Sequence, residues 1–284
     1  INQEFRVMAR RVSVPEIMGR KGGRKISMLT AYDFALAGLV DRSGVDMILV
    51  GDSLAMVGLG HKDSLGVGME AMILLTGAVS RAVERALVVG DMPFMSYQPS
   101  SELAVLNAGR FLAEAGARAV KVEGGTRVLS RIKAILAADI PVMGHIGLTP
   151  QSLARLGGFK VQGKTADAAK VLVEEAQILA EAGCFSIVLE AMPPHVAEMV
   201  TQAVSVPTIG IGAGPGCDGQ VLVTQDVLGL FERFKPKFVK RYAEIGKDIV
   251  TALSAFRAEV EDGSFPGEEH VYAMDGKELD KLKK

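Results

Sequence analysis

The feature that most constrains the fold of this chain is a repeated cassette, in which a helical stretch ends in Gly and a short apolar run then ends in an acid. The chain reads AEAGARAVKVEGG from residue 113 and AEAGCFSIVLEAM from residue 180, so Gly116 matches Gly183 and Glu123 matches Glu190. Gly readily adopts the left-handed conformation that ends many helices. A near-continuous apolar run is typical of a parallel strand buried on both faces. The cassette therefore predicts strands that alternate with helices.

Eight strand candidates occur along the chain, and the last is the weakest. They cover residues 26–31, 46–51, 87–91, 119–123, 141–145, 186–190, 208–211 and 220–223. Repeated strand–helix units predict a parallel sheet with helices outside it. Eight units in a chain of 284 residues favour a closed (β/α)8 barrel over an open sheet. The absence of a GxGxxG motif after the first candidate also disfavours an open dinucleotide-binding sheet.

We therefore predict an α/β protein with one (β/α)8 TIM-type barrel domain over residues 1–284. A short N-terminal extension, about 1–14, precedes the barrel, and a charged tail, about 272–284, follows it. We expect a helix over residues 242–261 to pack against the outside of the barrel.

Composition argues against several classes of partner. The formal net charge is −1, which argues against a nucleic acid or an anionic membrane as the main partner. The chain has no Trp and only 5% aromatic residues, so it offers no stacking surface for bases. No apolar run approaches the ~18 residues of a membrane-spanning helix. Cys184 and Cys217 fit no metal or redox spacing, and we expect a cytoplasmic protein that acts on small molecules.

Three acidic residues, Asp52, Asp91 and Glu123, stand at the ends of three consecutive strand candidates. In a barrel the carboxyl ends of the strands meet at one mouth, where active sites lie, and neighbouring strands are about 4.8 Å apart. Carboxylates that close repel one another unless a cation or proton compensates, and oxygen ligands suit Mg²⁺. The alternative is that each acid caps a following helix, although neither the MPF after Asp91 nor the GG after Glu123 resembles a helix start.

Three further polar residues are expected at the same mouth. Lys121 lies two residues before Glu123, on the same strand face, and its buried charge would pair with the carboxylates or with a substrate carboxylate. Glu190 ends the sixth candidate and is either a general base or a solvated rim acid. His145 ends the fifth candidate, where it could orient substrate, relay a proton or be a hydrogen-bonded structural histidine.

The most Gly-rich segment, GIGAGPGCDGQ at residues 210–220, allows two interpretations. Such a loop can hold a phosphate through backbone N–H groups. Equally, its glycines can allow a ligand or another loop to approach closely.

Long motifs in a fixed order resemble the ketopantoate hydroxymethyltransferase family over residues 12–270. They are TAYD (30–33), LVGDSL (49–54), GDMPFMSYQ (90–98), AVKVEGG (119–125), HIGLTPQS (145–152), LGGFKVQG (156–163) and PTIGIGAGPGCDGQVLV (207–223). The resemblance implies a (β/α)8 barrel that catalyses the first committed step of pantothenate synthesis. The implied reaction transfers a hydroxymethyl group from the co-substrate 5,10-methylenetetrahydrofolate to 3-methyl-2-oxobutanoate, giving 2-dehydropantoate. A homo-oligomer, often a decamer, is also implied.

The resemblance also assigns roles to residues at the mouth. Asp52 and Asp91 would bind Mg²⁺ directly, and Glu123 would belong to the same metal shell. Glu190 would accept a proton from the substrate. Four residues would contact the oxo acid: Asp52, Ser53, Asp91 and Lys121.

Two departures from the family pattern and three rival functions remain open. Ala55 stands where the family usually has Gly, and SLGVG at residues 64–68 replaces a Thr-x-Pro-Val-Thr-like stretch. One rival is a Mg²⁺-dependent 2-oxo acid lyase or mutase of the phosphoenolpyruvate mutase type, although no lyase-type cysteine motif is present. A second is a serine hydrolase, because residues 51–54 read GDSL and His270 could be its base. A third is a non-catalytic barrel scaffold.

Overall fold

Eight parallel strands close into a barrel in chain order, with β8 paired back onto β1. The computed structural model describes residues 11–282. The strands are β1 Ile26–Thr30, β2 Met47–Val50, β3 Leu87–Asp91, β4 Ala119–Glu123, β5 Val142–Gly147, β6 Ser186–Glu190, β7 Thr208–Ile211 and β8 Gly219–Leu222. All eight predicted strands are present, with bounds that differ from the prediction by at most two residues. The predicted (β/α)8 barrel is confirmed.

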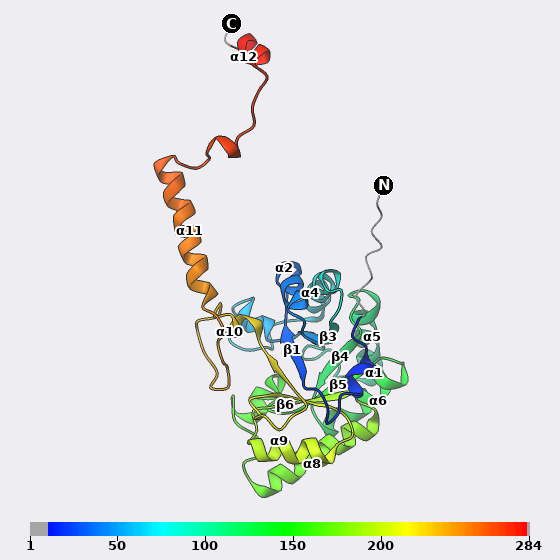
Figure 1. Ribbon diagram of the computed structural model, residues 1–284. Coiled ribbons are helices and arrows are strands. Elements are labelled where there is room, and N and C mark those ends of the chain that lie inside the picture. Colours follow the sequence, from blue (N-terminus) through cyan, green and yellow to red (C-terminus); the bar gives the residue numbers. More distant parts are fainter. Residues whose placement is uncertain (1–10, 283–284) are drawn as a thin grey trace.

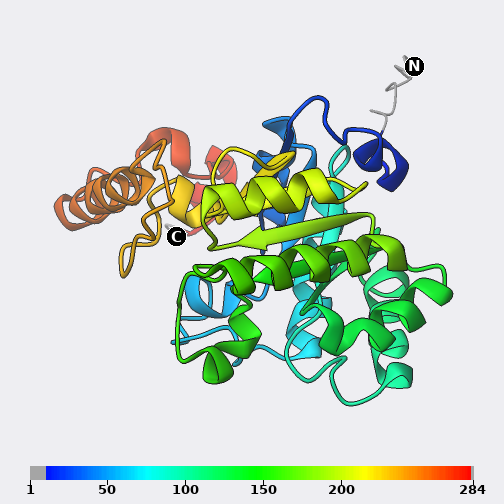
Figure 2. The same ribbon diagram turned by 90° about the horizontal axis from the view of Figure 1, so that it is seen from below.

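Helices from α2 to α9 are arranged around the strands (Figures 1 and 2). The α-helices are α1 Val14–Met18, α2 Phe34–Arg42, α3 Leu54–Val57, α4 Met69–Ala82, α5 Ser101–Ala113, α6 Leu129–Ala137, α7 Leu153–Leu156, α8 Ala166–Ala182, α9 Pro194–Ala203, α10 Thr224–Val227, α11 Ile245–Asp262 and α12 Gly276–Leu282. Short 3-10 helices are η1 Thr126–Val128, η2 Pro150–Ser152 and η3 Glu268–His270. Over residues 11–282, no helix is both long and apolar enough to cross a membrane.

The repeated cassette folds as its sequence indicates. Gly183 ends α8 with φ 104°, and Gly116 takes φ 69° between α5 and β4. Both angles are in the left-handed region, which glycine adopts without the steric cost of a Cβ. On α8, a stripe of small and branched residues is buried: Ala169, Leu172, Ala176 and Leu179. The helix is therefore fixed to the barrel by one apolar face.

The core has two layers that the strands separate. Alternate strand residues such as Leu87 and Val89 point into the barrel interior, whereas Val88 between them packs toward the outer helices. Gly90 belongs to the outer layer, where a Cβ would collide with the ring of Phe111 in α5. This alternation decides which residues at the strand ends face the mouth, because Asp91 has the same parity as Leu87 and Val89.

The C-terminal helix differs from the prediction. A helix forms close to the predicted range, as α11, but none of its residues is buried, and it projects away from the barrel (Figure 1). The expectation that it packs against the barrel is wrong, because within residues 11–282 no surface covers its apolar stripe. Within the predicted tail, α12 is exposed along its length. Most of the predicted N-terminal extension lies outside the described residues.

Candidate active site at the carboxyl ends of the strands

The three predicted carboxylates come together at the mouth of the barrel. Asp91 and Glu123 are the last residues of β3 and β4, and Asp52 follows β2 by two residues. One oxygen from each lies within 4.8 Å of the others, and all three residues are buried. The capping alternative does not hold for Asp91, which accepts a hydrogen bond at 3.2 Å from the backbone N–H of Asp52 across the mouth. By contrast, Asp33 does cap a helix, accepting the N–H of Leu36 at the start of α2.

Lys121 is the buried counter-charge of this cluster. Lys121 lies opposite Asp91 in the register of β3 and β4. Its Nζ is 2.6 Å from both carboxylate oxygens of Asp91 and 3.5 Å from Oε1 of Glu123. Burial by itself would lower the pKa of Lys121, but Asp91, Glu123 and Asp52 together raise it above its ordinary value. The lysine therefore stays protonated inside the barrel.

The carboxylates still exceed the positive charge that Lys121 supplies. The pKa of Asp52 is raised well above its ordinary value, first by burial and then by repulsion from Asp91 and Glu123. Burial also raises the pKa of Asp91, against the opposing effect of Lys121. Burial would raise the pKa of Glu123 too, but Lys121 and His145 lower it. A proton or a cation beside Asp52 would relieve this repulsion, and buried oxygen ligands of this kind fit Mg²⁺.

His145 lies between the carboxylate cluster and Glu190. Its Nδ1 is 3.4 Å from Oε1 of Glu123, and its Nε2 is 3.3 Å from Oε2 of Glu190. These distances are within ion-pair range, although neither ring nitrogen is aligned for a hydrogen bond. Burial and Lys121 lower the pKa of His145, but the two glutamates outweigh them and raise it to about 9. The protonated ring therefore links the two predicted functional carboxylates.

The backbone on either side of Glu190 is held by hydrogen bonds. The Glu190 carbonyl accepts the N–H of Leu148, and the N–H of Ala191 donates to the carbonyl of Ile211, both at 2.9 Å. Ala191 takes φ 47°, a left-handed conformation that costs a non-glycine residue about 1 kcal/mol or more. Glu190 is half-buried rather than fully solvated, so its carboxylate is positioned at the mouth by a turn that the surrounding structure enforces.

Two polar residues of the site were not predicted from the sequence. The Gln151 side chain donates to Oδ2 of Asp52 at 3.3 Å and to the Met92 carbonyl at 2.9 Å, and its backbone N–H donates to Oε2 of Glu123 at 3.0 Å. The hydroxyl of Tyr97 lies 2.8 Å from Oε1 of Gln151. The sequence signal that could have indicated Gln151 is the Pro-Gln pair at the start of η2, in the segment that follows β5.

Ser53 is placed beside the cluster but not as a hydrolase nucleophile. Its Oγ lies 2.8 Å from the hydroxyl of Tyr32. The suggested base, His270, is exposed in η3 beyond α11, where its Nδ1 accepts the N–H of Gly267. Because nucleophile and base must be in hydrogen-bond reach, the serine hydrolase interpretation is wrong.

The Gly-rich segment at residues 210–220 supports close packing. Gly212 and Gly214 have φ 64° and 80°. A Cβ on Gly212 would lie 2.7 Å from the ring of Phe238, and one on Gly214 would lie 2.6 Å from Cβ of Pro194. The glycines thus allow two neighbouring segments to approach. In the atypical segment at residues 64–68, Ser64 and Val67 are both buried.

The fold and the buried acidic cluster define a (β/α)8-barrel enzyme with its site at the carboxyl ends of the strands. The chain is similar to solved structures of phosphonopyruvate hydrolase, with a TM-score of 0.60 and 15% identity, covering 96% of this chain and 95% of that one. It is also similar to phosphoenolpyruvate phosphomutase from Streptomyces platensis, with a TM-score of 0.58, 17% identity and coverage of 95% and 97%. These likenesses show the fold alone. They do not favour the lyase or mutase alternative, and both cysteines are buried, with the pKa of Cys184 raised by burial to about 12.

The chain belongs to the ketopantoate hydroxymethyltransferase family, whose model matches residues 11–268. It is 64% identical to 3-methyl-2-oxobutanoate hydroxymethyltransferase of Syntrophobacter fumaroxidans, over 97% of this chain and 98% of that protein. It is 57% identical to the enzyme of the same name from Clostridium novyi, over 93% and 96%. The resemblance inferred from the motifs is confirmed, and the chain is an enzyme of the hydroxymethyltransferase class rather than a scaffold.

Proposed function

We propose that this enzyme transfers a hydroxymethyl group from 5,10-methylenetetrahydrofolate to 3-methyl-2-oxobutanoate, with Mg²⁺ held by Asp52 and Asp91 and with Glu123 in the same metal shell. The observation that carries the proposal is the buried group of three carboxylates, whose ligand oxygens lie within 4.8 Å of one another and of which Asp91 forms an ion pair with Lys121. Phosphonopyruvate hydrolase, which has the same fold, has been solved with oxalate and Mg²⁺. When bound, the metal would supply Lewis-acid polarisation of the substrate's 2-oxo group.

The chain's own residues would bind the oxo acid and transfer its proton. Lys121 places a fixed positive charge where the oxo acid develops negative charge, and electrostatic help of this kind contributes most in a site without water. Asp52, Asp91 and Ser53 would contact the same oxo acid. The position of Ser53 is fixed by the buried hydroxyl of Tyr32.

Glu190 is the proposed general base. It takes the proton from C3 of the oxo acid, and the resulting carbon nucleophile forms the new C–C bond with the methylene carbon of the folate donor. That carbon's bond to one of the two folate nitrogens breaks in exchange, and the nitrogen takes up a proton. Water then displaces the second nitrogen from the same carbon, which leaves a hydroxymethyl group, and this nitrogen takes up the proton that water gives up as tetrahydrofolate is released. His145 stands 3.3 Å from Glu190 and orients its carboxylate.

The test is deuterium exchange at C3 of 3-methyl-2-oxobutanoate in D₂O, followed by NMR with and without Mg²⁺, and then with 5,10-methylenetetrahydrofolate. We expect metal-dependent exchange without folate and 2-dehydropantoate with it. Folded, Mg²⁺-loaded protein that shows neither exchange nor product would overturn the proposal.

We also propose that the enzyme is a homo-oligomer in which α11 packs against a second copy, with a decamer as the form that the family resemblance suggests. Four residues of α11 at helical spacing share one face: Ile249, Leu253, Phe256 and Val260. Each is between 43% and 62% exposed. An apolar stripe on a helix of about 27 Å marks an interaction surface when its own chain leaves it uncovered.

A further inference from the structure

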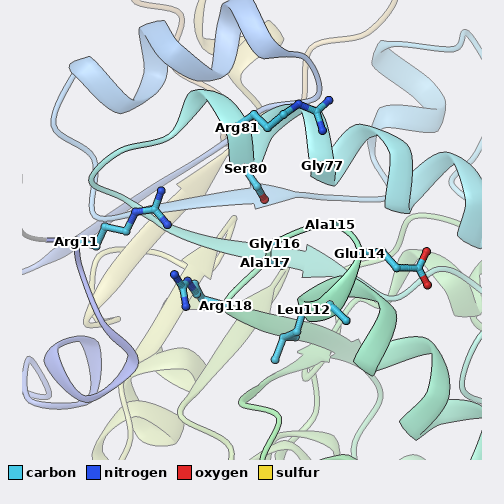
Figure 3. Close-up of a pocket in the computed structure, with 11 residues that line it drawn as sticks. Arg11, Gly77, Ser80, Arg81, Leu112, Glu114, Ala115, Gly116, Ala117 and Arg118 are labelled. Atoms are coloured by element: carbon cyan, nitrogen blue, oxygen red, sulfur yellow. The ribbon is translucent and has the colours of Figure 1, made fainter. Parts of the chain in front are cut away.

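A cavity of about 420 Å³ lies beside the amino end of β4, between the last turn of α4 and the turn after α5 (Figure 3). Arg118, which precedes the first residue of β4, lines one part of it. The last turn of α4 contributes Ser80 and Arg81, and Arg11 enters from the segment before α1. Because β3 and β4 begin at this end and carry their site residues at the other, the cavity is separate from the active site.

The lining is rich in positive charge that the described part of the chain does not neutralise. Within residues 11–282, the side chains of Arg81 and Arg118 make no hydrogen bond or ion pair. Arg11 is anchored, because its Nε and Nη2 donate to the carbonyls of Glu84 and Val83 at 3.1 and 2.9 Å. The carboxylate in the lining, Glu114, is already paired at 2.8 Å with Arg110.

A hydroxyl group adds a directed hydrogen-bonding group to this charge. Oγ of Ser80 is buried and has no hydrogen-bond partner in the described structure. Figure 3 shows it pointing into the space between Arg11, Arg118 and the Gly116 turn. Gly116 forms the turn that borders this space, with φ 69°, and Cβ of Ser80 lies in ordinary van der Waals reach of it. An unsatisfied buried hydroxyl costs free energy that a ligand acceptor would recover.

A second cavity, of about 260 Å³, shares Arg11 and Arg118 with the first. The rest of its lining is mainly apolar: Val12, Ser13, Val14, Ala86 and Leu87. Arg11 and Arg118 therefore lie between a polar cavity and a mainly apolar one. This arrangement suits a ligand with an anionic end and an apolar or aromatic body.

We propose that the two cavities form a binding site for a small phosphorylated molecule. The phosphate lies between Arg11 and Arg118, with the Ser80 hydroxyl as a further partner, and the organic part occupies the apolar cavity. Arg81 lines the cavity but points away from this position and adds only a more distant positive charge. Phosphate is favoured over a carboxylate because its several oxygens can accept from both guanidinium groups and the hydroxyl at once. The ligand binds at the amino ends of the strands and does not compete with the oxo acid at the carboxyl ends.

The test is isothermal titration calorimetry of the full-length protein at low ionic strength, with ADP, adenosine and inorganic phosphate as probes. We expect ADP to bind once per chain and more tightly than inorganic phosphate, and adenosine to lose most of the affinity. Arg118→Gln should weaken ADP binding by about tenfold or more, because it removes a charged hydrogen bond. Arg257→Gln, which removes the same charge from exposed α11, is the matched control and should leave binding unchanged.

Two further measurements keep the result interpretable. Arg118→Gln should retain its thermal unfolding temperature and its C3 exchange rate, which excludes misfolding as the cause of weaker binding. At one fixed Mg²⁺ concentration, ADP affinity should also be the same with and without saturating 3-methyl-2-oxobutanoate. The proposal is overturned if ADP fails to bind, if the oxo acid displaces it, or if Arg118→Gln binds it as wild type does.

Discussion

His145 stands on β5 with its Nε2 3.3 Å from Oε2 of Glu190, which ends the neighbouring strand β6. On its other side the same ring reaches the carboxylate cluster, with Nδ1 3.4 Å from Oε1 of Glu123. One buried imidazole thus positions both the proposed base and a member of the proposed metal shell. A single side chain thus connects the proposed base with the carboxylate cluster that we propose to hold the metal.

From this bridge we expect His145→Asn to slow Mg²⁺-dependent C3 exchange by about 10–100-fold, as is usual when a residue that orients a ligand is lost. The apparent Mg²⁺ affinity should fall as well, because the variant also releases Glu123. Both quantities can be measured in one NMR titration with Mg²⁺. A variant with wild-type exchange at all Mg²⁺ concentrations would exclude the positioning role.

Glu190→Gln should abolish C3 exchange while Mg²⁺ and oxo acid still bind. The amide cannot accept the C3 proton, and losing a general base lowers rates by about 10²–10⁴-fold. Binding is measured by calorimetry and exchange by NMR. Glu198→Gln, on the outer helix α9, is the control and should exchange at the wild-type rate. Undiminished exchange in Glu190→Gln would remove Glu190 from the base role.

Asp52→Asn should distinguish the destabilisation that the acidic cluster causes in the metal-free protein from its proposed role in binding Mg²⁺. The raised pKa of Asp52 means that its ionised form destabilises the metal-free fold at neutral pH. The variant should therefore unfold at a higher temperature than wild type without Mg²⁺, by about 2–4 °C for each kcal/mol gained. It should lose the further stabilisation that Mg²⁺ gives to wild type. If Mg²⁺ stabilises wild type and variant equally, the metal lies elsewhere.

The acid limit of stability should depend on Asp218. Burial would raise the pKa of this carboxyl, but the backbone N–H groups of Thr208 and Gly22 and the ammonium of Lys21 lower it. A lowered folded pKa adds stability above the unfolded value of about 3.9, and this stability is lost as pH falls through the folded pKa.

Asp218→Asn should therefore reduce the free energy of unfolding by about 1–3 kcal/mol at pH 7. The difference from wild type should disappear below the folded pKa, in urea titrations between pH 7 and pH 3 at fixed protein concentration. A difference that persists unchanged into acid would mean that packing, not charge, accounts for the effect.

Leu253→Asp should reduce the size of the assembly, because it places a charge in the apolar stripe of α11. The assembly mass is measured by size-exclusion chromatography with light scattering. Ser254→Asp adds the same charge to the adjoining position, away from the stripe, and should keep the wild-type mass. A monomeric wild-type protein, or equal masses for the two variants, would contradict the proposed role of α11.

Local sequence by itself determined the barrel and the position of its functional mouth. The Gly-terminated cassette marked the strands, and the period of two placed Asp91, Lys121 and Glu123 on the inner face, because side-chain direction in a strand follows from the pleat alone. Because the carboxyl ends of the parallel strands of a barrel meet at one mouth, the sequence also predicted that Asp52 and Glu190 lie at the same end of the molecule.

Only the tertiary structure decided which groups touch one another. The register between strands paired Lys121 with Asp91 and set His145 between two glutamates, and loop packing brought Gln151 to Asp52 over 99 positions of sequence. The structure also showed that α11 leaves the barrel, whereas the same amphipathic pattern had suggested a helix packed on it. A pattern of apolar residues predicts that one face of a helix will be covered. Which surface covers it depends on contacts with distant parts of the chain or with another chain. Those contacts cannot be predicted from local sequence.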